Sequence, residues 1–150
     1  MKGAYNMDFS EITIRDKEIF DKYLALYNPL ASEFTFTNFF MWREYYNFMY
    51  KIVDELLCVI AKPPGQDSYA LMPFGNIKKD NFIKAVSYLK EYFSKKGWKL
   101  QFQKVAEQDL RYFSFIGTSQ NDMVYDRDNS DYLYLTDELV NLRGKKFHAK

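Results

Sequence analysis

The sequence predicts an α/β domain of the α+β kind, with a mixed central sheet that opens as an antiparallel meander and is flanked by helices. The chain has 150 residues, 47% of them hydrophobic and 27% charged, which suits one globular domain with a real core. Two short apolar runs, "FMYKIVD" and "LLCVIAK", meet at Asp54-Glu55 and predict a hairpin. Helical patterns separate the later apolar runs, which predicts crossover connections.

The first quarter of the chain predicts an extended segment followed by two helices. "MDFSEITI" alternates apolar and polar residues, as a strand or an extended arm does. Asp16 can cap a helix that ends before Pro29. Its apolar face is Phe20, Tyr23, Leu24 and Tyr27. Residues 32–37 are expected to form a loop, and residues 38–47 a second helix.

The middle of the chain continues the sheet and then adds the clearest helix. "PPGQD" predicts a turn, and "SYALMPFG" a third strand. From Asp80 apolar residues recur at helical spacing, and Gly97 marks the end of that helix. These residues are Phe82, Val86, Leu89 and Phe93.

Four further elements are expected after this helix. "WKLQFQKV" alternates and predicts a strand, and "AEQDLRYFSFIG" predicts a short helix. "MVYDRDNSDYLYL" predicts a strand interrupted by a turn, and "TDELVNLRG" a last helix that ends at Gly144.

Composition excludes several classes of protein. The net charge of +1 provides no overall field for nucleic acid or a membrane. The single Cys58 excludes an internal disulfide and a multi-cysteine metal site, and its apolar surroundings predict a buried thiol. No run is long enough to span a membrane, and the N-terminus lacks the apolar segment of a signal peptide, so a cytoplasmic location is expected.

The usual catalytic and cofactor motifs are missing. The six glycines do not cluster as in a phosphate-binding loop, so no nucleotide cofactor is expected. His148 is the only histidine and stands in a lysine-rich end segment, which argues against a rigid catalytic base. Asp126, Asp128 and Ser130 fit the start of a calcium loop, but Asp131 occupies the position that needs glycine. A solvated turn is favoured there, and no metal site and no catalytic residue are assigned.

The stretch "SEFTFTNFFMWREYYNFMY" concentrates large rings around one arginine. Arg43 follows Trp42 and precedes Tyr46, so the rings and the guanidinium could hold a carboxylate or a phosphate. Packing of the rings in the core, with Arg43 paired to Glu44 or another surface acid, is the favoured alternative. A face that docks another domain is the third possibility.

The segment from Lys78 to Lys104 interleaves lysines with rings. Such a pattern could bind single-stranded nucleic acid through stacking and phosphate contacts. Phe93 and Trp98 are needed for buried faces, however, so a lysine-coated amphipathic helix is favoured.

Several segments together resemble the phosphatidylglycerol lysyltransferase C-terminal-like family. They are "SEFTFTNFFMWREYY", "LLCVIA", "YALMPFG", "AVSYLKEYFSKKGWKLQF" and "YDRDNSDYLYLTDELVNLRGKKFHAK", in this order over nearly the whole chain. The resemblance implies two acetyltransferase-like (GNAT) domains in tandem, of which residues 1–144 would be the first. Residues 145–150 would be a basic linker or tail toward a second domain.

The resemblance also implies a function. This half would supply an acceptor groove and an interdomain face to an aminoacyl-tRNA- or acyl-dependent transferase, and would not be active alone. The pyrophosphate loop of acetyltransferases is missing, and in related proteins the second domain mainly holds the donor. The expected partners are therefore a second GNAT-like domain or a homodimer partner, charged tRNA, and a small-molecule or lipid acceptor.

Six residues are the candidate substrate contacts: Trp42, Arg43, Tyr46, Lys145, Lys146 and Lys150. The main alternative is a non-enzymatic domain that docks a partner through its aromatic-rich surface. A free-standing CoA-dependent acetyltransferase is disfavoured by the missing phosphate loop.

Overall fold

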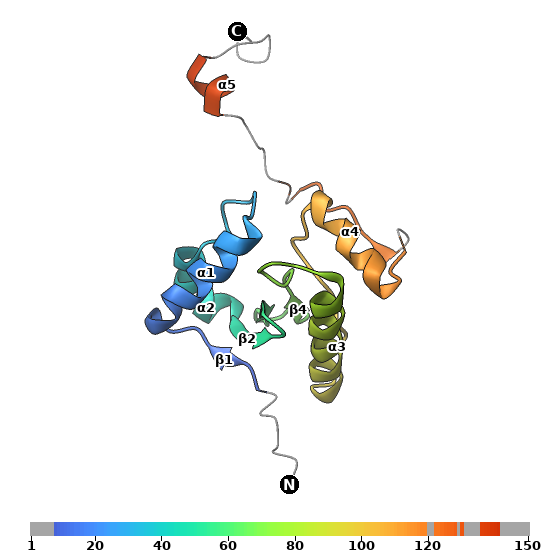
Figure 1. Cartoon of the computed structure of the whole chain (residues 1–150). Helices are drawn as coiled ribbons and strands as arrows, with labels where there is room; N and C mark the ends of the chain where they lie inside the picture. The colour runs from blue at the N-terminus through green and yellow to red at the C-terminus, as the bar shows by residue number, and fades with distance from the viewer. Residues whose placement is uncertain (1–7, 120–121, 129, 131–135, 142–150) are drawn as a thin grey trace. The chain divides into compact units, whose positions relative to one another are not determined.

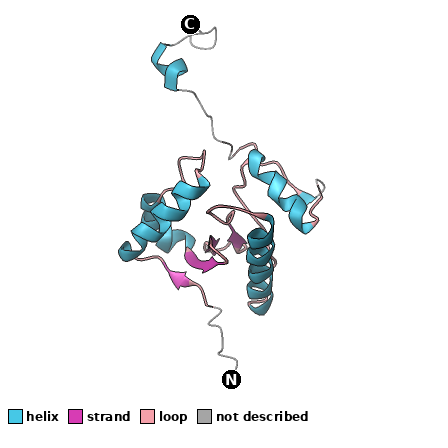
Figure 2. Ribbon diagram, in the orientation of Figure 1, coloured by secondary structure: helices cyan, strands magenta, loops and turns pink. Residues whose placement is uncertain are grey.

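The computed structural model describes residues 8–119, 122–128, 130 and 136–141. The chain divides into two compact units, residues 1–119 and residues 120–150. The first unit contains the sheet and most of the helices (Figures 1 and 2). Its strands are β1 (Ser10–Glu11), β2 (Met49–Val53), β3 (Leu56–Ala61) and β4 (Tyr69–Ala70). Its helices are α1 (Lys17–Tyr27), α2 (Phe36–Tyr46), α3 (Lys79–Lys95) and α4 (Leu110–Phe113), with 3₁₀ turns at Ile14–Asp16, Glu107–Asp109 and Ser114–Ile116.

The four strands form an antiparallel sheet in the order β1-β2-β3-β4. This confirms the predicted α+β class and the opening meander. The hairpin between β2 and β3 turns at Asp54 and Glu55, which have φ values of 48° and 67°. Positive φ at both positions matches the right-handed twist of the two strands, as in a type I′ turn.

Two predicted strands are shorter than expected. In "SYALMPFG" the named strand is β4, and Phe74 forms a further bridge with Leu57 after an interruption at Pro73, which has no N–H to donate. In "WKLQFQKV" pairing is limited to a parallel bridge of Phe102 with Ala70. This bridge gives the antiparallel sheet its mixed character, and α3 provides the crossover to it.

Strand β3 is the centre of the unit because all six of its residues are buried. Leu57, Val59 and Ala61 pack in one cluster with side chains of α1 and α2, whereas the alternate residues pack with side chains of α3. Successive side chains of a strand point to opposite faces, so each face needs its own cover. Figure 1 shows α1 and α2 on one side of the sheet and α3 on the other.

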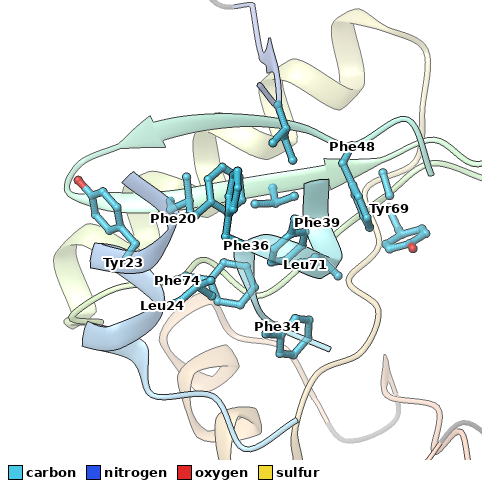
Figure 3. Close-up of a cluster of buried hydrophobic side chains, with 14 residues drawn as sticks. Phe20, Tyr23, Leu24, Phe34, Phe36, Phe39, Phe48, Tyr69, Leu71 and Phe74 are labelled. Atoms are coloured by element: carbon cyan, nitrogen blue, oxygen red, sulfur yellow. The ribbon is translucent and has the colours of Figure 1, made fainter. Parts of the chain in front are cut away.

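The first cluster is built largely from aromatic rings (Figure 3). The Phe20 ring is fully buried and its centroid lies 5.8 Å from that of Phe36 and 5.4 Å from that of Phe39. The Phe39 ring meets the fully buried Phe74 ring edge to face at 5.9 Å. Edge-to-face contacts of this kind stabilise a core beyond the area that they bury. Much of the opening aromatic stretch is therefore core.

The second face contains the buried thiol that the sequence predicts. Cys58 is fully buried in β3, and burial raises its pKa to about 12. The thiol is therefore protonated at neutral pH, and it packs as a small hydrophobe.

Helix boundaries follow local capping. Helix α2 begins within the segment expected to be a loop, because the Thr35 hydroxyl accepts the N–H of Asn38 at 3.2 Å. Asp16 stands at the N-cap of α1, but its carboxylate turns back to the Thr13 hydroxyl at 2.9 Å and to the Tyr50 hydroxyl at 2.7 Å. It thus ties the start of α1 to β2.

The second unit contains α5 (Thr136–Asn141), which lies within the predicted last helix. Residues 123–128 contain a bend and a turn but no strand, and the rest of that predicted strand falls outside the described residues. The Ser130 hydroxyl donates to the carbonyl of Asp126 at 2.8 Å, as expected for a turn. No helix in the described part of either unit has the length and hydrophobicity to cross a membrane.

Gly75 is a position where we expect any side chain to be costly. Its φ is 137°, and an added Cβ would lie 3.1 Å from the Glu55 carbonyl oxygen and 3.2 Å from Tyr23. Gly75→Ala should lower the free energy of unfolding by about 3 kcal/mol, measured by urea denaturation. Gly65→Ala is the control, because Gly65 has a φ of 70° and nothing within 4 Å of the added atom. It should cost about 1 kcal/mol; equal costs would contradict the packing argument.

Asp16 should contribute to acid sensitivity. Burial alone would raise its pKa, but hydrogen bonds from Thr13 and Tyr50 lower the pKa below its usual value. The stabilisation is therefore present above the unfolded-state pKa and is lost as the pH falls through the lower folded-state value. Asp16→Asn should destabilise the protein at pH 7 and flatten the decline of its melting temperature below pH 5, where the carboxylates titrate. An unchanged acid slope in this variant would show that other groups control it.

Candidate functional site

Arg43 is held by its own helix. Its guanidinium lies 4.0 Å from the centroid of the Phe40 ring and donates to the carbonyl of Phe40. A second nitrogen donates to Glu44 Oε1 at 3.1 Å. This geometry is the favoured alternative of the sequence analysis, in which Arg43 pairs with Glu44. A substrate contact of Arg43 stays a prediction.

The neighbouring rings of α2 divide between surface and core. Trp42 is 51% exposed, whereas Tyr46 is half-buried and stacks on Phe48 with a centroid distance of 5.1 Å. The Nζ of Lys104 lies 5.7 Å from the Tyr46 ring and also pairs with Glu33. Trp42, Arg43 and Tyr46 thus all lie in the C-terminal half of α2, and none of them lines the two hollows described below. Lys145, Lys146 and Lys150 lie outside the described residues.

A different set of residues forms a pocket of about 270 Å³. It is bounded by the end of α1, the loop after Phe74 and the turn that leads into α4. Its polar lining is Tyr27, Asn28, Asn76, Gln108, Asp109 and Arg111, and its apolar and backbone lining includes Leu26, Leu30, Gly75, Ile77 and Tyr112. We call this the Tyr27–Asp109 pocket.

Asp109 is the unusual group in this pocket, because its carboxylate belongs to a residue that is only 3% exposed. The hydroxyl of Tyr27 donates to its Oδ2 across 82 residues of sequence. Burial, and then this hydrogen bond, raise the pKa of Tyr27 well above its ordinary value. Tyr27 is therefore a permanent donor at neutral pH, and it fixes one oxygen of Asp109.

Local structure explains why these side chains meet. Helix α1 ends at Asn28, which has a φ of 54° and donates its N–H to the Leu24 carbonyl at 2.7 Å. The Tyr27 ring just before it packs edge to face on Phe74 at 5.1 Å. Asp109 closes a 3₁₀ turn, where its N–H donates to the Ala106 carbonyl at 2.9 Å. Each side chain thus comes from the last residue of a helical element, Tyr27 from α1 and Asp109 from the 3₁₀ turn.

Arg111 lies at the same pocket but does not neutralise Asp109. Its guanidinium donates to the Tyr112 hydroxyl at 2.9 Å and lies 4.8 Å from the centroid of that ring. No ion pair joins it to a carboxylate within the described residues. The side-chain hydrogen bond that Asp109 accepts is therefore the one from the Tyr27 hydroxyl, and its carboxylate lines the pocket.

The arrangement suits a small polar ligand that carries an N–H or an O–H. Such a group can donate to the carboxylate oxygen that Tyr27 leaves open, while the amides of Asn28, Asn76 and Gln108 offer both donors and acceptors. Among the described residues no group of three or more His, Cys, Asp and Glu side chains could hold a metal ion. The side chains that line this pocket can form hydrogen bonds to a ligand and exchange protons with it.

Local sequence patterns contain no direct signal for this pocket. The sequence predicts Tyr27 on the apolar face of a helix, and Asp109 stands in a segment where an acid usually caps a helix. Only the fold reveals that Asp109 is buried. An acid preceding the apolar "LRYF" run was the one available hint.

A solved structure of a conserved protein of unknown function from Bacteroides thetaiotaomicron matches with a TM-score of 0.77 and 24% identity. The match covers 93% of this chain and 46% of that one, so this chain spans about half of its length. At this identity the likeness supports the fold. No curated protein matches.

A match to a family profile identifies the family, whereas the solved structure supports only the fold. The profile described as "Phosphatidylglycerol lysyltransferase, C-terminal" matches residues 24–150, a range that includes α2, the sheet from β2 onward and both halves of the Tyr27–Asp109 pair. This agrees with the resemblance found from the sequence segments. The chain belongs to the phosphatidylglycerol lysyltransferase C-terminal family.

Proposed function

We propose that the protein is the acceptor-binding, N-terminal GNAT-like half of an aminoacyl-tRNA- or acyl-dependent transferase. The family assignment supports a lysyltransferase-related domain. In this function residues 1–144 act as the first domain and residues 145–150 as a basic linker. The protein would work in the cytoplasm, where charged tRNA is made.

The buried carboxylate of Asp109 in an open polar pocket is the observation that carries the proposal. Aminoacyl transfer from an ester begins with an activated leaving group, so the protein mainly has to position a nucleophile and accept its proton. The amine or hydroxyl of the acceptor donates to Asp109, while Tyr27 holds the carboxylate in place.

In the proposed reaction, the bonds formed, the bond broken and the proton transfers involve only the acceptor, the donor and Asp109. The acceptor nitrogen or oxygen bonds to the ester carbonyl carbon of the donor, and the ester C–O bond breaks. The proton of the acceptor passes to Asp109 and from there to the departing hydroxyl. Tyr27 keeps its own proton throughout because its pKa is raised.

The aminoacyl or acyl donor would need a binding surface on a second domain or a second chain. The solved structure that matches is about twice as long as this chain, which supports a second domain of similar size. That domain, or a homodimer partner, would hold most of the donor. Trp42, Arg43 and Tyr46 of α2, together with Lys145, Lys146 and Lys150, are proposed as further contacts to the acceptor or to RNA.

Substitution at Asp109 tests this function in the full-length product of the reading frame. Transfer of labelled lysine from charged tRNA is measured with phosphatidylglycerol vesicles and, separately, with putrescine as acceptors. Asp109→Asn should lower kcat/KM by about 100-fold or more, because a general base is lost. Tyr27→Phe should lower it by about tenfold, because the carboxylate loses the hydrogen bond that orients it.

The matched control is the other Asp–Tyr pair of the unit. Asp16→Asn and Tyr50→Phe break the hydrogen bond of 2.7 Å between these residues, outside the pocket. They should lower the melting temperature while leaving kcat/KM within about twofold of wild type, as for a mutation distant from the site. Full transfer by folded Asp109→Asn protein with both acceptors would refute the acceptor role.

A second candidate function is a non-enzymatic domain that docks a partner through α2. Met41, Trp42 and Tyr45 are 66%, 51% and 51% exposed, and the Trp42 and Tyr45 rings lie 6.3 Å apart. Large apolar side chains grouped on the exposed face of one helix are typical of an interaction surface. The proposed partner is the second domain or a second copy of the chain.

Replacement of this surface should change association but not folding. We expect residues 1–150 to self-associate or to bind a hydrophobic dye, and Met41→Lys with Trp42→Lys to lower dye fluorescence several-fold with a melting temperature near that of wild type. Light scattering and dye titration measure this. A wild-type chain that is monomeric and binds no dye would contradict the proposal that α2 forms an interaction surface.

A further inference from the structure

A second hollow of about 530 Å³ shares no residue with the Tyr27–Asp109 pocket. It lies where four segments meet: the start of the described chain, the end of α2, the end of β3 and the end of α3. Its lining is Asp8, Phe9, Asn47, Met49, Lys62, Tyr92, Lys96 and Trp98. We call it the Lys62–Trp98 hollow.

Rings and lysines are paired in this hollow. The Nζ of Lys62 lies 4.7 Å from the centroid of the Trp98 ring, and the Nζ of Lys96 lies 5.4 Å from that of Tyr92. Contact with a ring orients each ammonium but leaves its hydrogen-bond donors available. Within the described residues neither lysine forms an ion pair with a carboxylate.

The sequence places Trp98 here through the end of α3. Gly97 has a φ of 71° and donates its N–H to the Ser94 carbonyl at 3.0 Å, while Trp98 donates to the Phe93 carbonyl at 2.9 Å. These two bonds form a Schellman motif, in which the residue after the glycine packs back on the helix. The Trp98 ring accordingly meets the Phe93 ring at 5.7 Å and is only half-buried.

The hollow therefore offers one indole and two cations to the same ligand. Asp8 adds a carboxylate to the lining. An anionic ligand would therefore bind only if the two lysines attract it more strongly than Asp8 repels it. Tyr92 is buried, and burial raises its pKa, so its ring adds no charge at neutral pH. A ligand that combines a phosphate with a planar ring satisfies both features.

We propose that the Lys62–Trp98 hollow binds a nucleotide, with its phosphate at Lys62 and Lys96 and its base against Trp98. This site is independent of the acceptor pocket. The segment from Lys78 to Lys104 supplies Tyr92, Lys96 and Trp98 to this site. Lys62, which lies outside that segment, supplies the second cation.

Fluorescence of Trp98 provides the test. The chain has two tryptophans, so Trp42→Phe leaves Trp98 as the sole indole reporter. Residues 1–150 carrying Trp42→Phe are titrated with AMP, adenosine, inorganic phosphate and a short single-stranded oligoadenylate. AMP should quench Trp98 saturably, and adenosine and phosphate should each bind at least about tenfold more weakly, because each lacks half of the contacts.

Charge variants in the same background locate the site. Lys62→Ala and Lys96→Ala should each weaken AMP binding by roughly tenfold, whereas Asp8→Asn should strengthen it severalfold. Lys22→Ala is the matched control, because the Nζ of Lys22 lies 5.4 Å from the centroid of the Tyr23 ring on α1, and neither residue lines the hollow. It should leave AMP binding unchanged.

The outcomes separate the possibilities. Tighter binding of oligoadenylate than of AMP, with the same dependence on both lysines, would identify an RNA strand as the source of the nucleotide. Equal binding of phosphate and AMP would overturn the nucleotide assignment, because the ring would then contribute nothing. Absence of saturable quenching by AMP would overturn the proposed site. The same result would follow if Lys22→Ala weakened AMP binding as much as Lys62→Ala and Lys96→Ala do.

Discussion

The structure depends on one strand that cannot be exposed on either face. All six residues of β3 are buried, so the chain must supply cover on both sides of the sheet. Helices α1 and α2 supply one cover and α3 the other. In the chain, α1 and α2 precede the hairpin and α3 follows it. The parallel bridge at Phe102 returns the chain to the sheet after α3.

Both candidate sites lie where covering elements end. Asn28 closes α1 beside the Tyr27–Asp109 pocket, and Asn47 and Lys96 close α2 and α3 beside the Lys62–Trp98 hollow. Helix ends leave carbonyl groups and short polar caps at the surface, whereas the inward faces of α1, α2 and α3 are packed against the sheet. The ends can therefore carry binding groups without opening the core.

Local patterns predicted most of the elements, because their signals lie within a few residues. The continuous apolar run "LLCVIA" predicted β3 correctly, and the spacing from Phe82 to Phe93 with the glycine at Gly97 predicted α3 correctly. The strand expected at 98–105 was wrong in extent: its alternation is real, but only Phe102 reaches a pairing partner. Strand pairing depends on how far the neighbouring strand extends, and the local sequence pattern holds no information about that neighbour.

The candidate site was less accessible to sequence reasoning for a related reason. The aromatic neighbours of Arg43 in the sequence predict a substrate contact, yet in the structure its guanidinium contacts Phe40 and Glu44. Tyr27 and Asp109 are distant in sequence and unremarkable in their own segments. Their significance comes from burial of the acid and from the contact between them, both of which are properties of the fold.

The buried thiol of Cys58 has a practical consequence for spectroscopy. It is the only cysteine in the chain, it is fully buried, and its raised pKa keeps it protonated at neutral pH. A protonated thiol without solvent access reacts slowly with maleimides and other alkylating probes. A cysteine introduced at any exposed position would thus be labelled selectively in the native chain. Spin or fluorescent labels can be attached without first removing a residue from the centre of the sheet.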